Sequence, residues 1–150
     1  MPSARRFELP DLPATERLAA AVAALARKTD VLLLEGPLGA GKTAFARAFL
    51  RAASGDPMLE VPSPTFTLAQ TYETRLGPVH HFDLWRLSGP DALDELGWDE
   101  ARDDIVLVEW PDRLGNLRPA EALMLQLQPG IGDARHAILS GWPDRLGRLP

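Results

Sequence analysis

Two segments of the chain are apolar at every position, and an acidic residue follows each. Residues 31–34 precede Glu35, and residues 105–108 precede Glu109. A strand that is buried on both faces of a parallel sheet has an unbroken apolar run, whereas a half-exposed strand alternates apolar and polar residues. We therefore predict that both segments are buried strands and that the first lies in the centre of a parallel sheet.

Helical spacing precedes and follows the first apolar run. In residues 15–27 the apolar positions fall on one face of a helix, and Thr15 can cap its first turn. Residues 10–13 contain two prolines and predict a turn before this helix. A second helix is predicted over residues 43–53.

The remaining elements are shorter. Residues 66–75 and 79–87 are predicted to pair as a β-hairpin. Further strands are predicted at residues 5–9, 123–127 and 136–139, and a short helix at residues 91–96. Strands that alternate with helices along the chain indicate an α/β domain.

The length and composition of the chain indicate a single domain without a membrane-spanning segment. The chain has 150 residues, and we assign residues 1–140 to a single domain and residues 141–150 to a flexible C-terminal tail. Its first residues lack the apolar core of a signal peptide, and no apolar stretch approaches the roughly 20 residues that cross a bilayer. Because cysteine is absent, the chain can form neither a disulfide nor a thiolate site. We expect a cytoplasmic protein with no membrane contact.

Residues 36–43 match the phosphate-binding motif G-x-x-x-x-G-K-T and lie between a predicted strand and a predicted helix. Glycines let the backbone turn tightly and bring amide groups near a phosphate, and the helix points its positive end at the same anion. We predict that Lys42 reaches the β- and γ-phosphates of ATP or GTP and that Thr43 binds Mg²⁺. The predicted phosphate cradle comprises Pro37, Leu38, Gly39, Ala40, Gly41, Lys42, Thr43 and Ala44. The predicted fold is a three-layer, P-loop NTPase-like α/β fold with a mixed, largely parallel central sheet.

The same residues also match a weaker pattern. Gly39, Gly41 and Ala44 fit a loose dinucleotide-binding fingerprint, with Glu60 about where an acidic residue would bind a ribose. Glu60 does not follow a clear second strand, however, and the fingerprint has no role for a Lys-Thr pair. We therefore favour the phosphate-binding loop.

Two acidic residues are candidates for chemistry beside the phosphates. Glu109 ends the second apolar run, and Asp83 lies in a predicted strand. Either carboxylate can hold magnesium or orient the attacking water. The hydroxyls of residues 63–65 can sense a γ-phosphate, although an ordinary proline-containing loop explains them equally well. His80 and His81 would point to opposite faces of a strand, so we interpret them as packing and surface residues.

One hexapeptide occurs twice. Trp-Pro-Asp-Arg-Leu-Gly occupies residues 110–115 and 142–147. Glu109 precedes the first copy and Gly141 precedes the second, so the second copy cannot repeat a metal-binding role. The residues alone give no physical reason for the duplication.

Together these motifs resemble the TsaE (YjeE) family of bacterial P-loop ATPases. The P-loop is shared by a very large superfamily, and the Ser-Pro-Thr-Phe and Val-Glu-Trp-Pro segments make the match specific. The resemblance covers the chain from about residue 31 to residue 111. The matching segments after the P-loop are Ser63-Pro64-Thr65-Phe66, His81-Phe82-Asp83-Leu84-Trp85-Arg86-Leu87, Leu96-Gly97 and Val108-Glu109-Trp110-Pro111.

The resemblance implies a Mg²⁺-dependent ATPase that binds ATP and ADP during the threonylcarbamoyladenosine modification of tRNA. Family members work with the TsaB and TsaD proteins. TsaD performs the carbamoyl transfer, and ATP hydrolysis by the TsaE-like subunit resets the complex, with slow hydrolysis by the isolated subunit. The net charge of −5 disfavours direct nucleic-acid binding, so we expect contact with tRNA only through the complex.

The resemblance also implies roles for single residues. It places catalytic or metal-binding roles on the P-loop pair, a switch threonine, a strand aspartate and a magnesium-associated glutamate, and an adenine contact on a late basic residue. Lys42 and Thr43 are the P-loop pair, Thr65 is the switch threonine and Asp83 is the strand aspartate. Glu109 is the magnesium-associated glutamate, and Arg135 is the late basic residue.

Two other function classes stay open. A small-molecule P-loop kinase has a similar length, but it needs an acceptor pocket and usually an arginine-bearing lid. The stretch after Glu109 is short and shows no clear lid. A nucleotide-gated, non-catalytic scaffold would use the P-loop only to control docking.

Overall fold

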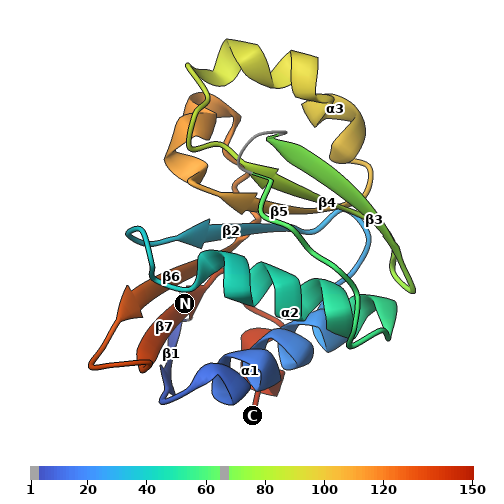
Figure 1. The fold of residues 1–150 in the computed structure, drawn as a ribbon. Helices are drawn as coiled ribbons and strands as arrows, with labels where there is room; N and C mark the ends of the chain where they lie inside the picture. Colours follow the sequence, from blue (N-terminus) through green and yellow to red (C-terminus); the bar gives the residue numbers. More distant parts are fainter. Residues whose placement is uncertain (1–3, 65–67) are drawn as a thin grey trace.

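The structure of the protein is a computed structural model that describes residues 4–64 and 68–150. In these residues seven strands form one sheet in the order β1-β7-β6-β2-β5-β4-β3 (Figure 1). The two apolar segments of the sequence are β2 and β5, which lie side by side in the middle. The strands are β1 (Ala4–Leu9), β2 (Val31–Glu35), β3 (Ala69–Thr74), β4 (Gly77–Asp83), β5 (Ile105–Glu109), β6 (Leu123–Pro129) and β7 (Arg135–Ser140).

Parallel pairing is confined to the four central strands. β2 pairs in parallel with β5 and β6, and β5 pairs in parallel with β4. β7 pairs antiparallel with β6 and β1, and β3 pairs antiparallel with β4. Because parallel strands end at the same edge of the sheet, the residues that follow β2, β4 and β5 come together there. The mixed sheet confirms the predicted α/β class.

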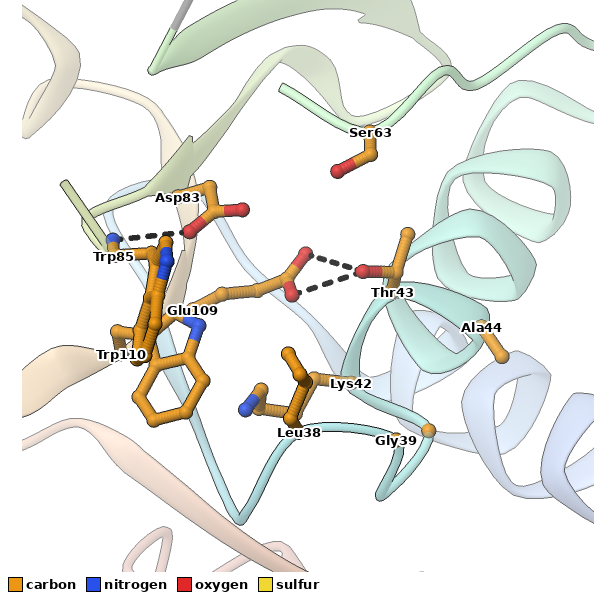
Figure 2. Close-up of a pocket in the computed structure, with 11 residues that line it drawn as sticks. Leu38, Gly39, Lys42, Thr43, Ala44, Ser63, Asp83, Trp85, Glu109 and Trp110 are labelled. Atoms are coloured by element: carbon orange, nitrogen blue, oxygen red, sulfur yellow. Dashed lines mark hydrogen bonds between the residues drawn. The ribbon is translucent and has the colours of Figure 1, made fainter. Parts of the chain in front are cut away.

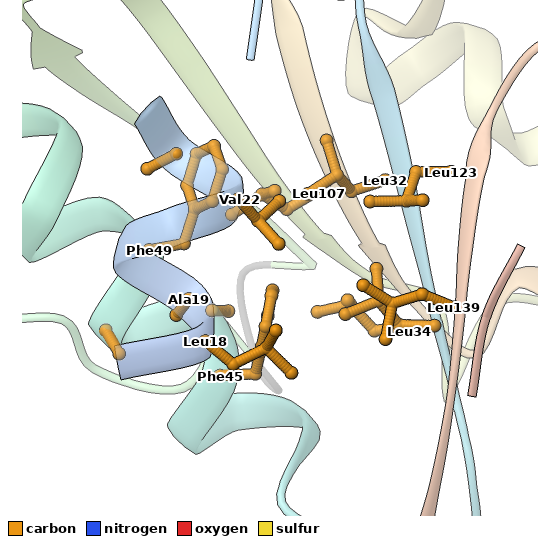
Figure 3. Close-up of a cluster of buried hydrophobic side chains, with 14 of the residues drawn as sticks. Leu18, Ala19, Val22, Leu32, Leu34, Phe45, Phe49, Leu107, Leu123 and Leu139 are labelled. Atoms are coloured by element: carbon orange, nitrogen blue, oxygen red, sulfur yellow. The ribbon is translucent and has the colours of Figure 1, made fainter. Parts of the chain in front are cut away.

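Helices cover both faces of the sheet (Figure 1). They are α1 (Leu12–Leu25), α2 (Lys42–Ser54), α3 (Trp98–Ala101) and the 3₁₀ helices η1 (Pro90–Leu96), η2 (Pro111–Leu117) and η3 (Leu146–Arg148). Leu32 and Leu34 of β2 pack in a buried cluster with α1 and α2 (Figure 3), whereas Val31 and Leu33 pack in a second cluster with η1, α3 and η2. These two cores confirm the predicted three layers. No helix in the described ranges is long and apolar enough to span a bilayer.

The first helix begins earlier than its sequence pattern predicts. Its N-cap is Asp11, whose carboxylate accepts a hydrogen bond from the Ala14 amide at 2.9 Å. Thr15, the predicted cap, is buried inside the helix. The prediction was wrong because Pro13 is tolerated in the first turn, where its missing N–H would have no helical partner.

The predicted hairpin is present, but its second strand is shorter than predicted. β3 and β4 pair from Ala69 with Phe82 to Thr74 with Gly77. β4 ends at Asp83 because the chain then turns, and the Leu87 amide donates to the Leu84 carbonyl at 3.0 Å. Residues 66 and 67 of the predicted first strand lie outside the described residues. The predicted helix at residues 91–96 is the 3₁₀ helix η1.

The last ten residues pack against the domain and differ in this from the predicted flexible tail. Trp142, Leu146 and Leu149 are 1–5% exposed and belong to the cluster beneath α1 and α2. The Arg145 guanidinium forms two hydrogen bonds with the Asp30 carboxylate, at 2.7 and 3.0 Å. No local pattern reveals this packing, because Arg145 and Asp30 are 115 positions apart in the sequence.

Candidate functional site

The loop between β2 and α2 has the backbone shape that its glycines predict. Gly36, Gly39 and Gly41 have φ angles of 151°, 81° and 101°. A Cβ at Gly36 would lie 2.4 Å from the carbonyl oxygen of Leu127 in β6, so a larger residue cannot occupy that position without moving the sheet. Gly41 is the N-cap of α2, and the first amide groups of this helix therefore open onto the loop.

Lys42 is the first residue of α2 and is only 5% exposed. Its ammonium group donates to the carbonyl oxygens of Gly36 and Pro37 and lies 3.4 Å from the centroid of the Trp110 ring. Burial lowers the pKa of Lys42 from its ordinary value, and the nearby Glu109 carboxylate offsets only part of this effect. The carbonyl dipoles and the ring face stabilise this buried cation. An anion that binds beside it would be favoured, because a buried charge is stabilised by pairing with an opposite charge.

Thr43 and Glu109 meet across the same loop (Figure 2). The Thr43 hydroxyl lies 3.0 and 3.2 Å from the two carboxylate oxygens of Glu109 and donates to them. Glu109 ends β5 and is 2% exposed. Hydroxyl and carboxylate oxygens are the hard ligands that Mg²⁺ prefers.

Asp83 lies beside Glu109 because β4 and β5 are parallel and the two residues are partners in register. Asp83 is 5% exposed, and its Oδ1 accepts a hydrogen bond from the Trp85 amide at 3.1 Å. Two carboxylates therefore stand at adjacent strand ends, on the edge of the sheet that carries the phosphate-binding loop.

A cavity of about 320 Å³ opens on these groups (Figure 2). Trp85 and Trp110 pack together in its wall, with ring centroids 4.5 Å apart. Ser63 also contributes to the wall, whereas Thr65, predicted as the switch threonine, lies outside the described residues. The lining residues are Leu38, Gly39, Gly41, Lys42, Thr43, Ala44, Ser63, Asp83, Trp85, Glu109 and Trp110.

The donor set fits a metal ion that is shared with a nucleotide. Within residues 4–64 and 68–150, no group of three or more His, Cys, Asp or Glu residues could hold a metal ion by itself. Mg²⁺ usually binds one or two carboxylates and completes its shell with phosphate oxygens and water. Thr43 and Glu109 provide such a partial shell next to the loop.

The adjacent histidines of β4 point to opposite faces of the sheet, as predicted. His80 Nε2 lies 3.0 Å from the Asp104 carboxylate, away from the cavity. His81 is fully buried, and its Nε2 lies 2.7 Å from Oε2 of Glu109. The interpretation of His81 as a packing residue missed this contact. Strand alternation places His81 on the same face as Asp83, two positions away, but the contact with Glu109 also depends on the register between β4 and β5.

Three other predicted residues lie at the margins of the cavity. Arg135 stands beside the loop, since a Cβ at Gly41 would lie 3.8 Å from its Nε. Its guanidinium donates to the Ala134 carbonyl at 2.8 Å. Pro37 lines a neighbouring cavity, and Ala40 is buried behind the loop.

The sequence matches one described protein family over most of its length. Residues 9–137 match the model of the family described as threonylcarbamoyl adenosine biosynthesis protein TsaE. The Rickettsia felis protein named tRNA threonylcarbamoyladenosine biosynthesis protein TsaE is 36% identical over 115 residues, which are 76% of this chain and 67% of that protein. The Bacillus subtilis protein of the same name is 36% identical over 123 residues, 81% of this chain and 75% of that protein.

The fold also matches a solved structure. The crystal structure of Bacillus subtilis YdiB aligns with a TM-score of 0.77 and 29% sequence identity. The alignment covers 99% of this chain and 93% of that chain. The similarity therefore extends beyond the P-loop to the whole sheet and its helices.

Proposed function

The chain belongs to the TsaE family, which acts in threonylcarbamoyladenosine biosynthesis on tRNA, and from this membership we propose that it is the subunit that binds and hydrolyses ATP with magnesium. The observation that carries the proposal is the meeting of Lys42, Thr43 and Glu109 at one phosphate-binding loop. These three groups supply a cation for phosphate and hard oxygens for a metal ion.

Each predicted site residue then has a distinct task. Lys42 would leave the carbonyl oxygens of the loop and bind the β- and γ-phosphates, while Thr43 and Glu109 would hold the metal ion. Bound magnesium would neutralise charge that develops on the phosphate oxygens. Asp83, beside Glu109, orients the attacking water, and Thr65 senses the γ-phosphate. Arg135 contacts the adenine from its position next to the loop.

The proposal includes the partner proteins of the reaction. TsaD performs the transfer to tRNA, TsaB completes the complex, and tRNA is reached through that complex. Because the modified molecule is tRNA, we place the activity in the cytoplasm. Binding to these proteins is expected to speed ATP hydrolysis, which is slow in the isolated chain.

Calorimetry tests the nucleotide site. Titration of ATP or ADP with magnesium should release heat with the wild type and not with Lys42→Ala. Lys28→Ala is the matched control, because Lys28 is the only other lysine and is exposed. A wild-type titration without heat contradicts the proposal.

Phosphate release tests the reaction and separates the alternatives. Release should rise when TsaB and TsaD are added and should disappear in Glu109→Ala. A rate of phosphate release that stays the same when TsaB and TsaD are added contradicts the partner assignment. Transfer of the γ-phosphate to a metabolite instead of water favours a kinase. Full tRNA modification in cells by a variant that binds but does not hydrolyse ATP favours a scaffold.

A further inference from the structure

We infer that His81 is a positioning residue that fixes the carboxylate of Glu109 for hydrolysis, an inference that rests on the proposed ATPase function. Its Nε2 lies 2.7 Å from Oε2 of Glu109, and the two side chains are 0% and 3% exposed. An ionised carboxylate can only accept hydrogen bonds, so the histidine Nε2 carries the proton and donates it.

The backbone holds His81 rigidly in this position. β4 is an inner strand, and His81 is paired with Gln70 of β3 on one side and with Leu107 of β5 on the other. Glu109 lies two residues beyond Leu107 on the same face of β5, so its carboxylate can reach back to the histidine ring. Side chains on rigid strands hold a functional group more precisely than side chains on loops.

The carboxylate needs this donor because it is buried. A buried charged group is costly unless hydrogen bonds replace the lost water. In the described residues Glu109 accepts from Thr43 and from His81. Under the proposed function the Thr43 hydroxyl would also bind the magnesium ion, whereas the His81 Nε2 contacts only Glu109 among the residues that the structure describes. The histidine is therefore the donor that keeps the carboxylate in place while a nucleotide is bound.

His81 has a matched control in its neighbour. His80 belongs to the same strand, but its Nε2 contacts Asp104 at 3.0 Å on the other face of the sheet. His81→Leu removes the donor to Glu109, His81→Gln restores an N–H at about the Nε2 position, and His80→Leu removes an equal group away from the site.

Steady-state phosphate release by the intact chain with its TsaB and TsaD partners measures the effect. In His81→Leu we expect kcat to fall about 10-fold to 100-fold, the range for one hydrogen bond to a charged group, with the dissociation constant for ADP changed less than about threefold. His81→Gln should recover most of the rate, and His80→Leu should keep it. A folded His81→Leu protein with normal kcat, or an equal loss in His80→Leu, overturns the inference.

A second measurement separates positioning from general damage to the fold. If His81 acts through Glu109, adding His81→Leu to Glu109→Gln should cause no further loss of kcat, whereas independent effects would multiply. Nitrogen-15 NMR of the wild-type protein should show the proton on Nε2 of His81, and protonation on Nδ1 alone overturns the inference even if His81→Leu does not fold. If the wild-type protein releases no phosphate at all, the proposed ATPase function itself is refuted. The failure of the proposed function is thereby distinguished from failure of the inference about His81.

Discussion

Residues 110–115 and 142–147 have the same six residues, and each copy begins just after a strand. Trp110 and Trp142 both have left-handed backbone conformations, with φ angles of 59° and 48°. A cation lies over each tryptophan ring, Lys42 at 3.4 Å and Arg145 at 3.8 Å. The leucine of each copy is buried. The first four residues of each copy form a similar turn, in which the arginine amide donates to the tryptophan carbonyl at 3.2 and 2.9 Å. The copies then differ, because Gly115 has φ 54° whereas Gly147 lies in η3 without a positive φ.

The surroundings of the two copies differ. The first follows Glu109 on a central strand, so its tryptophan faces the phosphate-binding loop and its leucine joins the cluster under η1 and α3. The second follows Gly141 after β7, and its leucine joins the cluster under α1 and α2. The comparison teaches that the shared tryptophan-to-arginine turn comes from the hexapeptide, whereas its role comes from the residue before it and from the neighbouring strands.

The largest effect on activity should come from removing the carboxylate of Glu109, which precedes only the first copy. Glu109→Gln should lower kcat for phosphate release by about 100-fold or more while ADP still binds, because the amide cannot replace a carboxylate in holding the ion. Phosphate release at saturating ATP measures this. Glu35→Gln is the control, since Glu35 also ends an apolar strand but lies outside the cavity and pairs with Arg118 at 3.3 Å. Equal losses in both variants would contradict the role of Glu109.

The next effect should be shared by the two copies. Leu114→Ala and Leu146→Ala each remove a side chain that is at most 1% exposed. Each should lower the free energy of unfolding by about 2–5 kcal/mol, which urea denaturation can measure. ADP affinity should stay normal in Leu146→Ala, which lies outside the nucleotide cavity. Unchanged stability in Leu146→Ala would support the flexible tail that the sequence predicts and contradict the packing of η3.

Local signals predicted most of the fold and of the cavity. The apolar runs, the P-loop and the acidic residue after β5 are each contained in fewer than ten residues, so β2, β5, Lys42, Thr43 and Glu109 could be placed from the sequence. Asp83 could also be placed, since it ends a strand. These predictions needed no knowledge of which segments are neighbours in space.

Contacts between distant segments could not be predicted in the same way. The His81 contact with Glu109 depends on the register between β4 and β5, which no local pattern states. The packing of Trp142 depends on a cluster built from α1, α2 and the sheet. Strand alternation does place His81 on the same face of β4 as Asp83. This is the one local signal that limits which residues His81 can contact.

A smaller effect should come from adding a methyl group before the second copy. Gly141 has φ 93°, and a Cβ there would lie 2.4 Å from the carbonyl oxygen of Ala122. Gly141→Ala should therefore cost about 1–3 kcal/mol of unfolding free energy. Gly77→Ala is the control, since Gly77 has φ 88° with open space around it and should cost only about 1 kcal/mol. Equal costs would show that the contact with Ala122 adds nothing and that the backbone conformation alone demands glycine.

The smallest effect should distinguish the two arginines of the repeat. Arg145 forms bonds of 2.7 and 3.0 Å to Asp30 and one of 2.9 Å to the Leu25 carbonyl, and both charged side chains are 12% exposed. Within the described residues, Arg113 makes one bond of 3.3 Å, to the Leu87 carbonyl. Arg145→Met should therefore cost about 1–2 kcal/mol of unfolding free energy, because it breaks a bidentate, partly desolvated pair. Arg113→Met should cost less than about 0.5 kcal/mol.

A double-mutant cycle between Arg145→Met and Asp30→Asn assigns this cost to the ion pair. The two changes should be less than additive by about 1 kcal/mol, and the coupling should shrink in 1 M salt because part of the pair reaches solvent. Strict additivity would mean that Arg145 stabilises the chain through Leu25 and its own Trp142 ring instead. In the part of the chain that the structure describes, the first copy has no equivalent ion pair to test, because the cation over its tryptophan ring is Lys42. Under the proposed function Lys42 must be able to move from this ring to a phosphate.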